Sequence, residues 1–282
     1  MSSKLRDSLA RDGFVVIPSL LSPTQLSSLR AASLQTTSLA RDSGWRHIRT
    51  LPKQFPPWTS DPSAGIWGVQ HLLHPDLPTS PTFIQNYFSD EVLDPVKELL
   101  ECEDEDLVME LFNLLVRPER NWSLRWHRDN ISADATPEEE LEILRNSKGN
   151  HAQWNLALYD DSSLIVIPGS HSRARTSEER LADPYAPTLT SMLVVTLKAG
   201  DCVFYNNNIL HRGVYESSKE RMTLHGSVGT KGHGVERARN VLQHGIGDYV
   251  DRVDLSSLGE VGSRLRDRAE GMRSRAVEMG KG

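Results

Sequence analysis

The sequence predicts a mainly β protein with flanking helices, in which the strands form an antiparallel sandwich or barrel. From about residue 107 the chain consists of short apolar runs separated by turn residues, which is typical of short antiparallel strands. Several short strands at such spacing indicate an antiparallel sandwich or barrel rather than alternating βαβ units. No internal repeat or flexible linker divides the 282 residues, so we expect one domain spanning residues 1–282.

The first 40 residues predict a helical N-terminal part that contains one strand. Residues 3–12 have a helical pattern, and the β-branched run at 14–17 that follows predicts a strand. Ser22 is a suitable N-cap and Pro23 fits the first helical position, so a second helix should run from there to about residue 39.

Residues 42–80 predict a long ordered loop region. They contain six prolines and three of the six tryptophans. A loop of this length in a compact domain usually has a function, often as a lid or binding wall. We therefore expect this segment to cover the entrance of a site.

The core is expected to span about residues 107–230. Thr136, Pro137 and Glu139 form an N-cap, a first-turn proline and a capping-box glutamate, so a helix should begin there, between the second and third apolar runs. The tail at 234–282 is predicted to be helical. The eight runs are LVMELFNLLV, WSLRWHRD, AQWNLALYD, SLIVIPG, MLVVTL, DCVFYN, LHRGVY and RMTLHGSV.

Composition excludes several classes of partner. A net charge of -6 argues against nucleic acid or an anionic membrane, because both need basic patches. No apolar run approaches a membrane span of about 20 residues, and the N-terminus lacks a signal-peptide core. Two cysteines are too few for a disulfide framework. We expect a cytoplasmic monomer or homodimer that acts on a small molecule.

The most informative segment is Trp122-Ser123-Leu124-Arg125-Trp126-His127-Arg128-Asp129. On a strand, Arg125, His127 and Asp129 share one face, so an imidazole and a carboxylate can point at one metal ion. His211, at the start of a later run, is the best third ligand. Two histidines and one carboxylate, with open positions left over, suit oxygen-binding iron(II). A lone His-x-Asp pair is common by chance, so the assignment depends on the rest of the pattern.

Arg221 follows His211 by ten residues and shares a predicted strand face with Thr223 and His225. A guanidinium inside a barrel needs an anionic partner, and its planar fork suits a carboxylate. That partner is either the distal carboxylate of 2-oxoglutarate or an acidic side chain in a structural salt bridge.

At this point the sequence resembles the phytanoyl-CoA dioxygenase family of iron(II) and 2-oxoglutarate oxygenases over most of its length. The resemblance implies a double-stranded β-helix, also called a jelly roll, of cupin-like type. The matching segments are Asp12-Gly13-Phe14-Val15-Val16, Leu21-Ser22-Pro23, Trp126-His127-Arg128-Asp129, Ala157-Leu158-Tyr159-Asp160, Leu164 to His171, Ala199-Gly200-Asp201-Cys202-Val203-Phe204, His211-Arg212-Gly213 and Arg221.

The resemblance also implies a reaction and roles for individual residues. His127, Asp129 and His211 would hold Fe(II), and Arg221 would bind the distal carboxylate of the co-substrate 2-oxoglutarate. With O2, the enzyme would hydroxylate or desaturate a small organic metabolite and release succinate and CO2. Phytanoyl-CoA itself is not implied, because the family includes many oxygenases of small natural products.

Two departures from the family pattern affect the site. The loop before the Pro-Gly-Ser-His turn is shortened to Asp160-Asp161-Ser162-Ser163, and Leu124 stands where many relatives carry a glutamine. The inner carboxylate of 2-oxoglutarate therefore needs another contact, for which the candidates are Asn155, Gln153, Asn113 and Gln70. We expect at least two of Asn155, Gln153, Arg125 and His225 to line the cavity.

Two other classes of function remain compatible with the sequence. One is a cupin-like isomerase or hydrolase that uses zinc or manganese, which predicts metal at the triad without a role for Arg221. The other is a catalytically silent binding protein of the same fold.

Overall fold

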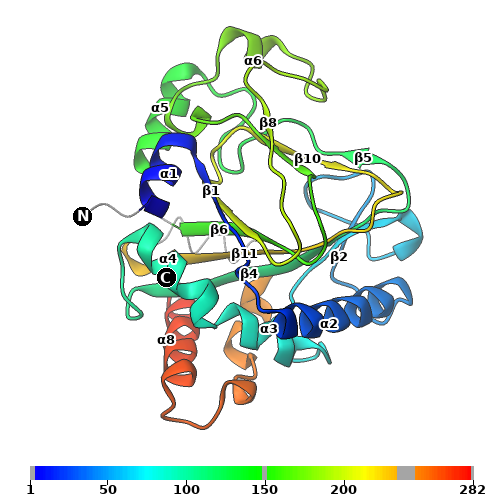
Figure 1. Ribbon diagram of the computed structural model, residues 1–282, viewed down its shortest axis with the longest axis vertical. Coiled ribbons are helices and arrows are strands. Elements are labelled where there is room, and N and C mark those ends of the chain that lie inside the picture. Colours follow the sequence, from blue (N-terminus) through cyan, green and yellow to red (C-terminus); the bar gives the residue numbers. More distant parts are fainter. Residues whose placement is uncertain (1–3, 148–150, 234–244, 281–282) are drawn as a thin grey trace.

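The computed structural model describes residues 4–147, 151–233 and 245–280, and its centre is a pair of facing sheets with helices around them (Figure 1). The larger sheet has seven strands in the order β1-β9-β6-β11-β4-β3-β2, and the smaller has the order β5-β10-β7-β8. The strand bounds are β1 Phe14–Ile17, β2 Ile48–Thr50, β3 Ile66–Val69, β4 Leu107–Val116, β5 Trp122–Ser123, β6 His151–Ala157, β7 Leu164–Val166, β8 Leu193–Val194, β9 Cys202–Tyr205, β10 His211–Tyr215 and β11 Met222–Thr230.

Strands β4 to β11 correspond one by one to the eight apolar runs of the sequence, and every pairing given between them is antiparallel. The alternation predicted for the last run is observed. Met222 and Leu224 of β11 join the main core, whereas Thr223 and His225 face the other way. Gly226 has no room for a side chain, because a Cβ there would lie 2.3 Å from the Trp154 ring.

Helices cover the outer face of the larger sheet, and the main hydrophobic core lies between them. In Figure 1, α8 runs below this sheet, and α2 and α3 lie beside each other near its β2 edge. The predicted capping box at Ser22 is present on α2, as is the one at Thr136 on α5. The helix bounds are α1 Lys4–Asp12, α2 Pro23–Arg41, α3 Ser80–Tyr87, α4 Asp90–Leu100, α5 Pro137–Asn146, α6 Ser177–Leu181 and α8 Arg264–Met279.

The segment 42–80 is not entirely loop. Its strands β2 and β3 extend the larger sheet beyond β4, with Arg49 opposite Gly68 and Gly68 opposite Leu115. Between them, residues 54–58 lie against the cavity described below. The prolines that suggested a continuous loop fall outside these two strands.

The predicted strand at 122–129 is shorter than expected. Regular pairing covers only Trp122–Ser123. The amide of Leu124 still donates to Gly213 O of β10 (2.8 Å), but the two amides after it find partners outside the sheet. The amide of Arg125 donates to Gln54 Oε1 (2.9 Å) and that of Trp126 to Pro184 O (2.8 Å). His127 then returns to an isolated bridge with His211.

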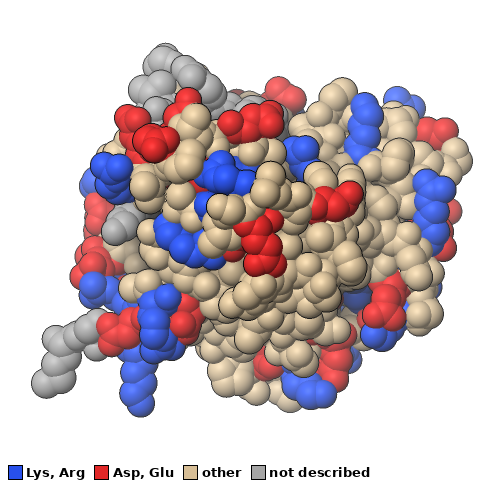
Figure 2. Space-filling view, turned by 90° about the horizontal axis from the view of Figure 1, so that it is seen from above, with Lys and Arg blue, Asp and Glu red and all other residues tan. Residues whose placement is uncertain are grey.

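The C-terminal part contains α8, preceded by short 3-10 turns between residues 246 and 258. Residues 234–244 of the predicted helical tail lie outside the described residues. None of the described helices is both long and apolar enough to cross a membrane. Figure 2 shows acidic and basic side chains interspersed over the face that it presents, in keeping with the small net charge.

Candidate metal centre

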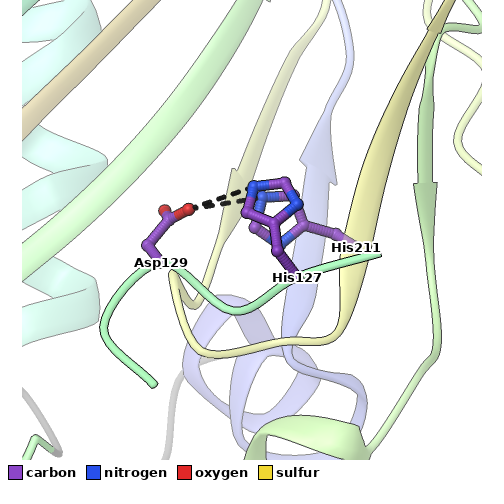
Figure 3. A group of neighbouring side chains, drawn as sticks. All are labelled: His127, Asp129 and His211. Carbon is purple, nitrogen blue, oxygen red and sulfur yellow. Dashed lines mark ion pairs between the residues drawn. The ribbon is translucent and has the colours of Figure 1, made fainter. Parts of the chain in front are cut away.

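Three predicted ligands meet between the two sheets. One ligand atom from each of His127, Asp129 and His211 lies within 4.8 Å of the others. Asp129 Oδ1 is 3.4 Å from His127 Nε2 and 3.7 Å from His211 Nε2 (Figure 3). Backbone hydrogen bonds hold the two histidines next to each other, since the amide N–H groups of His127 and His211 each donate to the carbonyl of the other (3.0 Å).

Both imidazoles present Nε2 to the centre. Nδ1 of His127 is 2.8 Å from Arg125 O, and Nδ1 of His211 is 2.8 Å from Ile209 O. A carbonyl only accepts hydrogen bonds, so Nδ1 carries the proton in each ring and the Nε2 lone pair is available to a metal. Burial, and then the neighbouring His127 ring, lower the pKa of His211 to about 4, which keeps it neutral at neutral pH.

Asp129 completes the donor set as a carboxylate. A hydrogen bond from Gln153 favours the ionised form of this side chain. Gln153 Nε2 donates to Oδ2 (3.0 Å), which leaves Oδ1 toward the two histidines. Two imidazoles and one carboxylate, held by backbone and amide hydrogen bonds, form the donor set typical of non-haem iron(II) sites.

A buried ionic cluster fixes the chain around these ligands. Arg128, between His127 and Asp129, donates to Ser170 O (2.9 Å) and Asn208 O (2.5 Å). Its side chain is fully buried beside the equally buried carboxylate of Glu140 on α5. Arg175 and Arg180 also bind Glu140. Burial lowers the pKa of Arg128 to about 10, so the guanidinium stays charged. It ties the segment His127-Arg128-Asp129 to α5.

A cavity of about 390 Å³ opens at the triad. This volume falls in the range of small-molecule sites, roughly 300–1,000 Å³. Its aromatic walls are Phe55, Trp58, Trp67 and Tyr205. Phe55 and Tyr205 pack edge-on against the two histidines of the triad, with ring centroids 5.7 Å from His127 and 5.5 Å from His211. Segment 42–80 therefore supplies part of the wall, as its length and composition led us to expect.

The other predicted site residues divide between the cavity and its surroundings. Gln153 and His225 line it, whereas Asn155 and Arg125 do not. Asn155 Oδ1 is 2.9 Å from Nδ1 of the wall residue His225, so Asn155 contacts the wall without facing the cavity. Arg125 is exposed and lies over the Phe55 ring, 5.2 Å from its centroid.

The two remaining amide candidates are buried beside the cavity. Asn113 accepts a hydrogen bond from the amide of His71 (3.1 Å), which occupies its side-chain oxygen. Gln70 is also buried, and neither residue belongs to the cavity wall in the described parts of the chain. Of the four candidates for the inner carboxylate, only Gln153 faces the metal centre.

Arg221 has an acidic partner in the structure. Its Nε donates to Asp161 Oδ2 (2.9 Å) and its Nη2 to Thr223 Oγ1 (3.1 Å). The guanidinium also lies over the Tyr215 ring, 4.5 Å from its centroid. Arg221 Nη1 is buried without a hydrogen-bond partner among the described residues, and Arg221 is not part of the cavity wall there.

The sequence profile of the family described as phytanoyl-CoA dioxygenase (PhyH) matches residues 9–223. The chain belongs to the phytanoyl-CoA dioxygenase family. The resemblance inferred from the sequence is thereby confirmed. This is a family of iron(II)- and 2-oxoglutarate-dependent oxygenases. The enzyme class predicted from the sequence is therefore also confirmed.

Solved structures with the same fold share less than a fifth of their residues with the chain, and they confirm the double-stranded β-helix. EctD from S. alaskensis with bound Fe has a TM-score of 0.58 and 18% identity, over 83% of this chain and 78% of that one. HygX from Streptomyces hygroscopicus with nickel and 2-oxoglutarate has a TM-score of 0.56 and 18% identity, over 81% of this chain and 87% of that one. SnoN, a non-heme alpha ketoglutarate dependent epimerase from nogalamycin biosynthesis, has a TM-score of 0.55 and 17% identity, over 80% of this chain and 79% of that one. Comparison with curated proteins gave no match.

Several cavity residues carried no signal in the sequence. Arg49, Trp58 and Trp67 come from the proline-rich segment, and Tyr205 and Asn207 come from β9 and the turn after it. The tryptophans were visible as a local enrichment, but nothing indicated which would face the metal.

Proposed function

We propose that the protein hydroxylates or desaturates a small organic molecule, using Fe(II), 2-oxoglutarate and O2 and releasing succinate and CO2. The observation that carries this proposal is the two-histidine, one-carboxylate triad at the wall of a 390 Å³ cavity in a double-stranded β-helix. A site of this volume suits a co-substrate and a compact metabolite.

Each residue of the centre has a defined task in this proposal. His127, Asp129 and His211 hold Fe(II), which together with 2-oxoglutarate and O2 supplies the oxidising chemistry. Gln153 keeps one Asp129 oxygen directed at the metal position. Phe55 and Tyr205 restrict the two imidazoles and exclude water from them. A carboxylate at position 129 argues against halogenation, which needs that coordination position free for a halide.

Arg221 remains our predicted anchor for the distal carboxylate of 2-oxoglutarate. Three features support this assignment: its position immediately before β11 and beside Thr223, its buried Nη1, which has no hydrogen-bond partner among the described residues, and the adjacent Thr223 hydroxyl. In this assignment the co-substrate carboxylate binds beside Asp161, or replaces it at the guanidinium.

The reaction is tested by anaerobic titration followed by product analysis. Fe(II) and then 2-oxoglutarate should produce the visible charge-transfer absorption of a 2-oxo acid chelated to iron, with one equivalent of each bound. After oxygen is admitted with a metabolite panel, a product that has gained one oxygen atom identifies hydroxylation, and one that has lost two hydrogens identifies desaturation. Wild-type protein that binds iron but gives no chelate absorption would contradict the proposed co-substrate.

A further inference from the structure

Arg49 is the one cavity-wall arginine or lysine among the described residues, and its charge is not neutralised there. No hydrogen bond or ion pair joins its guanidinium to another described residue, and the buried Nε atom has no partner among them. Burial lowers the pKa of its guanidinium, an effect that the nearest ionisable groups only partly oppose. Arg221, in contrast, has the Asp161 carboxylate 2.9 Å away.

The sheet directs Arg49 to the inner face. Strand pairing places Arg49 opposite Gly68, Gly68 opposite Leu115, and Leu115 opposite Thr223, so these four residues form one row across β2, β3, β4 and β11. Residues in such a row project to the same side of a sheet. Leu115 is a cavity-wall residue, so the row faces the cavity.

Glycine at position 68 makes room for the arginine. A Cβ on Gly68 would lie 3.0 Å from Arg49 Cδ and 3.3 Å from its Cβ and Cγ. The aliphatic stem therefore lies across the backbone of β3. Its guanidinium reaches the rings of Trp58 and Trp67, with Cζ 5.3 Å from each centroid. Two aromatic contacts hold the planar fork in place without using its N–H donors.

We propose that Arg49 is an anion-binding residue of this cavity and that it recognises a carboxylate or a similar anionic group on a ligand of the metal centre. A shielded cation with unused donors is stabilised when a ligand supplies the missing charge. The inference rests on the proposed function for its choice of ligands. If Arg221 binds the co-substrate, the anionic group belongs to the organic substrate, which defines the substrate class as anionic.

The first test separates the two sources of the anionic group. Iron-loaded, oxygen-free protein is titrated with 2-oxoglutarate and with 2-oxopentanoate, which has the same chain length but lacks the distal carboxylate. We expect Arg49→Gln to retain the wild-type preference for 2-oxoglutarate. Loss of that preference by about tenfold or more would also support anion binding by Arg49, but would name the co-substrate as the source and contradict the Arg221 assignment.

The second test probes the anion site directly, without turnover. Inorganic phosphate and benzoate are titrated at constant ionic strength into protein with and without Fe(II) and 2-oxoglutarate, and the fluorescence of the tryptophans beside Arg49 is recorded. We expect saturable binding by the wild type, weakening by at least about tenfold in Arg49→Gln, and an intermediate result in Arg49→Lys. Arg125→Gln is the matched control, because Arg125 is an exposed arginine over Phe55 outside the cavity wall.

The outcomes are decisive when each variant has a wild-type circular dichroism spectrum and melting profile. Two results together would overturn the proposal. The first is that Arg49→Gln keeps the wild-type preference for 2-oxoglutarate. The second is that it binds phosphate and benzoate as the wild type does, or that the wild type binds neither. If the wild type binds phosphate or benzoate but forms no iron chelate with 2-oxoglutarate, the proposed function fails while the anion site stands.

Discussion

Replacing Asp129, His127 or His211 by alanine should abolish tight binding of Fe(II) while leaving the protein folded. Each substitution removes one of three ligands, and the remaining two do not make a stable site. The Asp129 side chain retains 28% exposure, so its loss leaves no large void in the core. Isothermal titration with Fe(II) under nitrogen measures the loss, and circular dichroism checks the fold. Asp134→Ala is the matched control, since this exposed carboxylate lies on the same loop outside the cavity wall.

The size of the loss in Fe(II) affinity distinguishes a metal ligand from a residue that only hydrogen-bonds to a ligand. Gln153→Leu removes the hydrogen bond to Asp129 Oδ2 but no ligand. Losing an outer partner of a ligand typically weakens metal binding by roughly 10–100-fold. We expect Gln153→Leu to fall in that range and the three ligand variants to lie beyond it. Wild-type iron affinity in any ligand variant would remove that residue from the site.

Replacing Arg221 by alanine should have two separable effects. The first is on stability, because Asp161 would remain buried without its cationic partner, and removing one member of such a pair costs on the order of 3–5 kcal/mol. The second is on 2-oxoglutarate, for which losing a charge-assisted contact of about 2–5 kcal/mol weakens binding roughly thirty-fold or more. Arg221→Lys keeps the charge but loses the fork, so it should be intermediate.

The two effects are separated by adding Asp161→Asn to the Arg221→Ala variant. The neutral amide removes the unpaired buried charge, so urea denaturation should show part of the lost stability restored. The preference for 2-oxoglutarate over 2-oxopentanoate should stay low, because the guanidinium is still missing. If Arg221→Ala retains the wild-type preference, Arg221 acts only as the partner of Asp161, and Arg49 becomes the leading candidate for the anchor.

The sequence predicted the core well because its signals are local. Alternation along each run fixes which side chains face inward, and Arg221, Thr223 and His225 were correctly expected to share a face for this reason. His127 and Asp129 could be proposed as a pair because only Arg128 separates them on one backbone stretch. His211 was proposed as the third ligand from its position at the start of a later apolar run together with the family resemblance.

The features that escaped prediction depend on contacts between distant segments. Strands β2 and β3 are only three and four residues long, and they form because the edge of β4 offers them a partner. Arg49 consequently reaches the cavity through a pairing that nothing near residue 49 indicates. The same holds for Asp161, whose loop brings it to Arg221 from 60 residues away. The early end of β5 follows from hydrogen bonds to Gln54 and Pro184, which also lie far along the chain.

The most direct measurement of the central claim is the fate of oxygen during turnover of 2-oxoglutarate. Enzymes of this class place one atom of O2 in succinate, and slow uncoupled turnover allows the test before the organic substrate is known. Wild-type protein with Fe(II), 2-oxoglutarate and heavy-isotope dioxygen should release succinate that carries one labelled oxygen, above the level given by iron alone and by the Asp129→Ala protein. Unlabelled succinate, or none beyond those controls despite bound iron, would contradict the account and favour a metal-dependent enzyme that is not an oxygenase.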